Sequence, residues 1–149
     1  MANVPPVPAL AHFIKPTVDT LFHIDYTWWE KQGLDLNVQL MAHLPAELRE
    51  VYAGQRVKEK IDLVDWDTGE VKQVEGLQYL IATRCNEDPD YVLNAPTLLE
   101  TIFRVFLSNG NRPLSARQLA ARVGQPAERI LGVLSGRRVS KGLRPHRAG

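Results

Sequence analysis

The sequence predicts an α+β fold in two parts: a small acidic α+β unit that contains a β-hairpin, and a basic helical module that follows it. The first observation is the charge, which changes sign near residue 96. Residues 1–96 carry 8 Lys and Arg against 15 Asp and Glu, a net charge of −7, whereas residues 97–149 carry 10 against 2, a net charge of +8. The second is the hydrophobic pattern, which changes near the same position from mixed strand and helix periods to a series of short helices. We therefore expect a proline-rich arm at 1–19, an acidic unit at 20–96 and a basic module at 97–149.

The composition is that of a globular protein with a buried core, because 44% of the 149 residues are apolar and 23% are charged. Cys85 is the only cysteine, which excludes a disulfide framework and a cysteine-based zinc site and favours a cytoplasmic location. The N-terminus lacks the basic start and apolar run of a signal peptide, and no apolar run approaches the roughly 20 residues that span a bilayer. We expect neither secretion nor a role in a membrane.

The first elements follow from prolines and from alternation. Proline denies the arm a regular hydrogen-bonded structure, and four prolines fall within the first sixteen residues: Pro5, Pro6, Pro8 and Pro16. From Leu21 onward the apolar side chains alternate with polar ones, which predicts a half-buried strand that presents Phe22, Ile24, Tyr26 and Trp28 on one side. The alternative is that Trp28-Trp29-Glu30 begins a helix.

The middle of the acidic unit reads as helices around a hairpin. Leu36, Leu40, Met41 and Leu44 recur at helical spacing as far as Pro45, which can open a second helix that ends at Gly54. Residues 61–66 and 70–74 flank Gly69, whose freedom to adopt positive φ suits a hairpin turn. A short helix over 77–85 and a turn-rich stretch over 86–90 complete the unit.

Three helices are predicted in the basic module by their start and stop signals. Thr97 and Glu100 have the spacing of a capping box, and Asn109-Gly110 ends that helix. Ser115 and Gln118 form a second capping box, which opens a helix that stops at Gly124. Pro126, at the first helical position, then opens a third helix that runs to Ser135-Gly136.

Residues 116–135 resemble the helix-turn-helix superfamily. Small Ala120 lets the two helices approach, Gly124 makes the turn, and apolar side chains such as Leu119 and Ile130 fill the space between them. Residues 137–144 are similar to the basic wing of winged-helix members. The resemblance implies that the helix over 126–135 enters a major groove of double-stranded DNA, while the wing and the helix ends contact phosphates.

The DNA-contacting residues expected from this resemblance fall into two groups. The outward side chains of the third helix supply few base-contacting groups, and they include Gln125, Glu128 and Arg129. The cations suited to phosphate are nearly all arginine, whose planar fork favours bidentate contact. They are Arg112, Arg117, Arg122, Arg137, Arg138, Lys141, Arg144 and Arg147.

We therefore expect a non-enzymatic DNA-binding protein, a transcriptional regulator or DNA-associated accessory factor, whose acidic unit dimerises or binds a partner. The alternative is an adaptor subunit of a multiprotein complex that uses the winged-helix fold for protein contacts. The adjacent Trp28 and Trp29 are the expected partner contact, since neighbours on a strand point to opposite faces.

Other constellations support neither catalysis nor a cofactor. His12, His23, His43 and His146 are scattered singly, which predicts no metal site. The carboxylates of the hairpin, which include Asp65 and Asp67, are expected to be solvated rather than to bind a cation. Cys85 shares an apolar helix face with Leu77 and Ile81, which predicts a buried small hydrophobe rather than a nucleophile.

Overall fold

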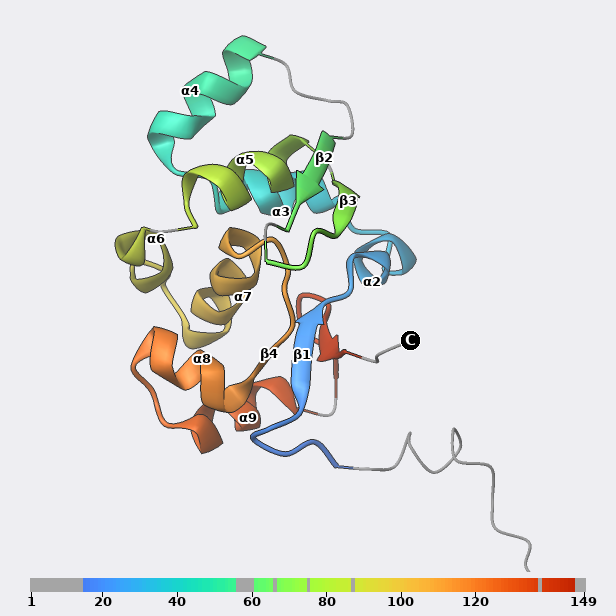
Figure 1. The fold of residues 1–149 in the computed structure, drawn as a ribbon, viewed down its shortest axis with the longest axis vertical. Helices are drawn as coiled ribbons and strands as arrows, with labels where there is room; N and C mark the ends of the chain where they lie inside the picture. Colours follow the sequence, from blue (N-terminus) through green and yellow to red (C-terminus); the bar gives the residue numbers. More distant parts are fainter. Residues whose placement is uncertain are drawn as a thin grey trace, which may run out of the picture.

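The computed structural model describes residues 15–55, 61–65, 67–74, 76–86, 88–136 and 138–146. Strands and helices are mixed along the chain, so the predicted α+β class is confirmed (Figure 1). The elements before residue 97 are β1 (Leu21–Ile24), α2 (Tyr26–Lys31), α3 (Leu36–Ala42), α4 (Ala46–Gln55), β2 (Ile61–Val64), β3 (Val71–Val74), α5 (Gly76–Arg84) and α6 (Pro89–Leu93). Those after it are α7 (Leu98–Ser108), β4 (Leu114–Ser115), α8 (Ala116–Val123), α9 (Ala127–Leu134) and β5 (Leu143–Pro145).

The first strand is shorter than the alternation predicts. β1 ends at Ile24, because the Asp25 side chain accepts a hydrogen bond from the Thr27 amide and caps helix α2. The prediction that Tyr26 and Trp28 continue the strand is therefore wrong, and the helical alternative is confirmed. Of the expected arm at 1–19, residues 1–14 lie outside the described residues.

The other predicted elements of the acidic unit are confirmed. Helices α3 and α4 meet at Pro45, and strands β2 and β3 pair antiparallel around a turn in which Gly69 has a φ of +75°. Helix α5 covers the predicted short helix. The turn-rich stretch instead leads into α6, whose first turn is capped by Asp88 and holds Pro89.

The helices of the basic module begin and end where their signals predict. The Thr97 hydroxyl accepts from the Glu100 amide at 3.1 Å, and the Glu100 carboxylate accepts from that hydroxyl. At α8 both bonds of the capping box form, and Gly124 ends the helix with a φ of +70°. Pro126 is the N-cap of α9 rather than its first residue, so this helix begins at Ala127, one residue later than predicted.

The two parts of the chain share one sheet. The strand order is β4-β1-β5, so the N-terminal strand lies between two strands of the basic module and is antiparallel to both. β5 pairs with β1, and none of the described residues between α9 and β5 forms a strand, so the basic segment makes no hairpin of its own there. Figure 1 shows β1 beside β4 at the end of the molecule that carries α8 and α9.

One hydrophobic core spans both parts. Helix α7 lies at its centre, between the α3 and α5 helices on one side and α8 and α9 on the other (Figure 1). The largest fully buried side chains include Phe22, Ile24, Leu40, Ile81, Phe103, Phe106, Leu119 and Ile130. Among the described residues, no helix is both long and apolar enough to cross a bilayer.

Candidate nucleic-acid interface

Helices α8 and α9 pack against each other across a three-residue connection. Leu119, Val123, Ile130 and Leu134 are buried, and this apolar contact fixes the angle between the helices. Ala120 is half-buried, as expected for a position where two helices approach. The polar side chains of both helices are therefore left on the outside of the pair.

The outward face of α9 is as thinly equipped as the sequence predicts. Glu128 and Arg129 are exposed and Gln125 is half-buried. Arg129 Nη1 donates a hydrogen bond to Gln125 Oε1 at 3.0 Å, so two of the three polar side chains predicted on this face bind each other. The bond occupies one Arg129 donor and the Gln125 oxygen, so Gln125 can make a bidentate contact with a base only after it breaks.

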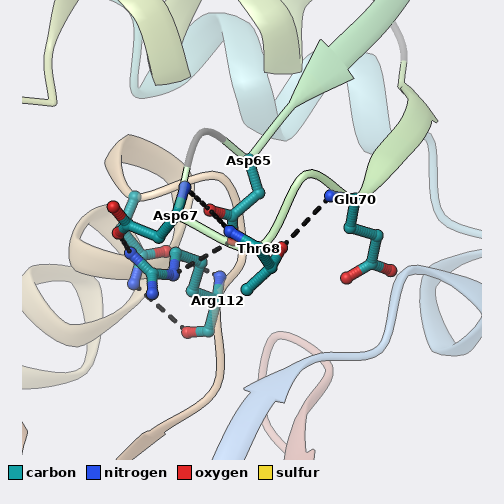
Figure 2. Close-up of polar contacts among 6 residues, drawn as sticks. Asp65, Asp67, Thr68, Glu70 and Arg112 are labelled. Carbon is teal, nitrogen blue, oxygen red and sulfur yellow. Dashed lines mark hydrogen bonds and ion pairs between the residues drawn. The ribbon is translucent and has the colours of Figure 1, made fainter.

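Arg112 forms ion pairs with the β2–β3 hairpin, although 49% of its side chain is exposed. Its Nη1 lies 2.7 Å from Asp67 Oδ2, and its Nε lies 3.3 Å from Asp65 Oδ2 (Figure 2). Asn109 fixes its backbone, donating to the Arg112 carbonyl and accepting from its amide. The Asp67 amide and Arg112 together hold the pKa of Asp65 below its usual value. Asp67 remains 72% exposed, as expected for a solvated turn carboxylate, but the sequence did not predict that both carboxylates also pair with Arg112.

Two further arginines form the same kind of contact. Arg117 Nε lies 3.0 Å from Asp19 Oδ1, and Arg144 Nη1 lies 3.2 Å from Asp25 Oδ2. Partial burial opposes ionisation of Asp25, but hydrogen bonds from Thr27 and the charge of Arg144 leave its pKa lowered. Every ion pair among the described residues joins a cation after residue 97 to a carboxylate before residue 96. The opposite charges of the two parts are thus partly matched inside the fold.

Three of the predicted DNA-contacting arginines have no ion pair within the described part of the chain. Arg122 on α8, Arg129 on α9 and Arg138 after α9 are all exposed. Lys141 is half-buried, with its Nζ 5.4 Å from the centre of the Phe103 ring and 3.5 Å from Gln39 Oε1. Arg137 and Arg147 lie outside the described residues.

Trp28 and Trp29, the expected partner contact, are both at least half-buried in the structure. Trp29 is only 3% exposed, and its Nε1 donates to the Lys141 carbonyl at 3.1 Å. Trp28 is half-buried and packs edge-on against the Trp29 ring. Since both tryptophans lie on one turn of α2, the strand argument for opposite faces fails. Trp29 ties α2 to the C-terminal loop and is not available to a partner.

Sequence reasoning missed a buried polar cluster and a histidine pair. His43 is 3% exposed, and its Nδ1 accepts from Arg104 Nε at 3.1 Å, while Arg104 Nη1 donates to the Tyr91 carbonyl. His23 and His146 meet across the β1–β5 ladder. No local signal could have found either group, because their members lie 13 to 123 positions apart in sequence.

Cys85 lies where the sequence predicts. It is 2% exposed, and burial raises the pKa of its thiol to about 11. A thiol that stays protonated near neutral pH is a poor nucleophile, so Cys85 acts as a small core hydrophobe. No family model, curated protein or solved structure matches this chain.

Proposed function

We propose that this protein is a non-enzymatic DNA-binding protein that contacts the phosphate backbone of double-stranded DNA through α8, α9 and the loop after α9. The observation that carries the proposal is the set of exposed cations Arg122, Arg129 and Arg138, which form no ion pair within the described part of the chain. Backbone contact suits them, because arginine binds phosphate in a bidentate manner. The Arg129–Gln125 bond and the negative charge of Glu128 argue against strong base recognition.

A salt-dependent titration tests this proposal. Labelled duplex DNA is titrated with the full chain at several salt concentrations, and each phosphate neutralised on B-DNA contributes a slope of about −0.9 to the logarithmic plot. The triple variant Arg122→Gln, Arg129→Gln and Arg138→Gln should bind more weakly, with a slope shallower by up to about 2.7.

A matched variant removes the same charge elsewhere. Lys31→Gln, Lys72→Gln and Arg84→Gln alter three exposed cations of the acidic unit and should leave the slope unchanged. If both triple variants lose affinity equally, or if the wild type fails to bind at low salt, the proposal is wrong.

The hairpin contact gives a second prediction. Asp65→Asn with Asp67→Asn should release Arg112 while the amide oxygens still accept the turn hydrogen bonds, so DNA affinity should rise several-fold and the salt slope should steepen by about 0.9. Asp62→Asn with Glu70→Gln removes the same charge from the same hairpin. Both residues are exposed, and the Glu70 carboxylate points away from Arg112 (Figure 2). An equal change of slope in the two double variants would mean that net charge, not release of Arg112, controls binding.

A second candidate function is an adaptor subunit that binds protein. Ion pairs within the chain already engage Arg112, Arg117 and Arg144, which leaves fewer cations for DNA. In addition, Leu34 and Val38 are 47% and 62% exposed near the start of α3 and offer apolar surface to a protein partner. Light scattering after size exclusion separates the candidates. An assembly that Val38→Ser disrupts, together with no binding of DNA at low salt, would favour the adaptor.

A further inference from the structure

The strongest unassigned feature is a pair of histidines at the junction of β1 and β5. His23 lies within β1, and His146 follows β5, where its amide donates to the Leu21 carbonyl at 2.7 Å. Their rings meet edge-on with centres 4.7 Å apart, and the two Nδ1 atoms face each other at 3.4 Å. Both side chains are half-buried, so the backbone holds them in place while solvent reaches them.

That separation matches the geometry of two ligands on one metal ion. Zinc binds imidazole nitrogen at about 2.0–2.1 Å, and two nitrogens at a tetrahedral angle on such an ion lie about 3.3–3.4 Å apart. Without an ion, only one proton fits between the two Nδ1 atoms, since each neutral imidazole has a single N–H. In the neutral pair at least one Nδ1 carries a lone pair, and both do when each ring carries its proton on Nε2.

From this geometry we propose that His23 and His146 form a binding site for a single Zn²⁺ ion. The cations Lys72 and Arg144 lie near His23 and oppose the charge of a bound ion. Asp25, anchored by Arg144 and Thr27, supplies the opposing negative charge beside the pair.

The remaining coordination positions belong to water. Within the described ranges, no group of three or more histidine, cysteine or carboxylate side chains is arranged to hold an ion. Two imidazoles select borderline metals, whereas Mg²⁺ and Ca²⁺ require oxygen ligands. An ion at this site would bridge the N-terminal strand to the end of β5, so binding would stabilise the folded chain.

Calorimetric titration of the full chain with ZnCl₂ at pH 7.5 tests the site. We expect one ion per chain, no response to MgCl₂, and a melting temperature that rises with Zn²⁺. His23→Asn and His146→Asn should each weaken binding by more than about tenfold, since even the partners of metal ligands contribute that much.

A measurement on the unaltered protein guards against variants that fail to fold. In ¹⁵N spectra of the imidazole rings, Zn²⁺ should shift the Nδ1 signals of both His23 and His146 together and leave that of the buried His43 in place. A shift of neither signal, a shift of only one, or undiminished binding by a folded His146→Asn variant would overturn the proposal. None of these readouts depends on DNA.

Discussion

Gly142→Ala is expected to destabilise the fold by about 3 kcal/mol, because two costs add at this position. Gly142 has a φ of +75°, which an alanine adopts only at a cost of about 1 kcal/mol or more. A Cβ there would also lie 2.7 Å from the Asp25 carbonyl oxygen and 3.0 Å from Trp29 Nε1. Neither neighbour can retreat, since the Asp25 amide donates to the Gly142 carbonyl at 2.7 Å and Trp29 donates to Lys141.

Two other glycines separate the backbone cost from the clash. Gly124 has nearly the same φ, +70°, with open space around it, so Gly124→Ala should cost only about 1 kcal/mol. Gly132 lies exposed within α9 without a close neighbour, so Gly132→Ala should stabilise by up to about 1 kcal/mol. Urea unfolding followed by tryptophan fluorescence and circular dichroism measures all three. A loss at Gly142 no greater than the loss at Gly124 would show that the loop can move away from α2.

Local signals predicted most of the helices because each depends on groups a few residues apart. The capping box of Ser115 and Gln118 is complete within three positions, and the turn glycines Gly69, Gly110 and Gly124 all adopt positive φ. The helix α6 was missed although Asp88-Pro89 is a start signal, since five residues are too few to show a hydrophobic period.

The contacts that decide function are not local, and the sequence could not predict them. Alternation predicts that β1 is a strand, but its pairing with β4 and β5 depends on chain segments more than 90 positions away. The same holds for Arg112, Arg117 and Arg144, whose charge predicts a polyanion as well as it predicts a carboxylate of the same chain. Charge counts along a sequence therefore overstate how much positive charge a folded module presents.

Ion pairing within the chain divides the cations after residue 97 into those that are paired and those that are not. Arg112, Arg117 and Arg144 join the two parts of the chain through ion pairs whose side chains are all at least one fifth exposed. Such exposed pairs contribute little to stability individually and are screened by salt. Among the described residues after residue 97, Arg122, Arg129 and Arg138 are the exposed cations that form no ion pair.

Acid should destabilise the protein between about pH 6.5 and pH 4 through His43. Its ring is 3% exposed, lies against Phe103, and accepts at Nδ1 from Arg104. Burial first, then the charges of Arg104 and Lys141, lowers the pKa of His43 from 6.5 to about 4, against a smaller opposing effect of Glu100. Protonation of His43 would place a second buried positive charge beside Arg104, and it would break the hydrogen bond that His43 Nδ1 accepts from Arg104.

The direction of this pH effect depends on which state, native or unfolded, binds the proton at His43. Between the two pKa values the unfolded chain is protonated at this position and the native chain is not, so the free energy of unfolding falls as the pH falls. The contribution is complete above about pH 6.5 and lost below about pH 4, and a difference of about 2.5 pKa units corresponds to about 3 kcal/mol. Urea midpoints at pH 7, 5.5 and 4.5 measure it.

The variant His43→Asn isolates this residue from the other groups that titrate in acid. Its amide oxygen can still accept from Arg104 Nε, but it has no proton to gain in this range. We expect the variant to be less stable than the wild type at pH 7, because a smaller side chain leaves space beside Phe103, and to lose less stability towards pH 4.5. Asp25 and Asp65 have lowered pKa values, so their contributions to the stability of the fold are lost only in stronger acid. This loss is common to the wild type and the variant. Parallel pH profiles for wild type and variant would therefore mean that His43 is protonated in the native fold without cost, and that the Arg104 cluster opens in mild acid.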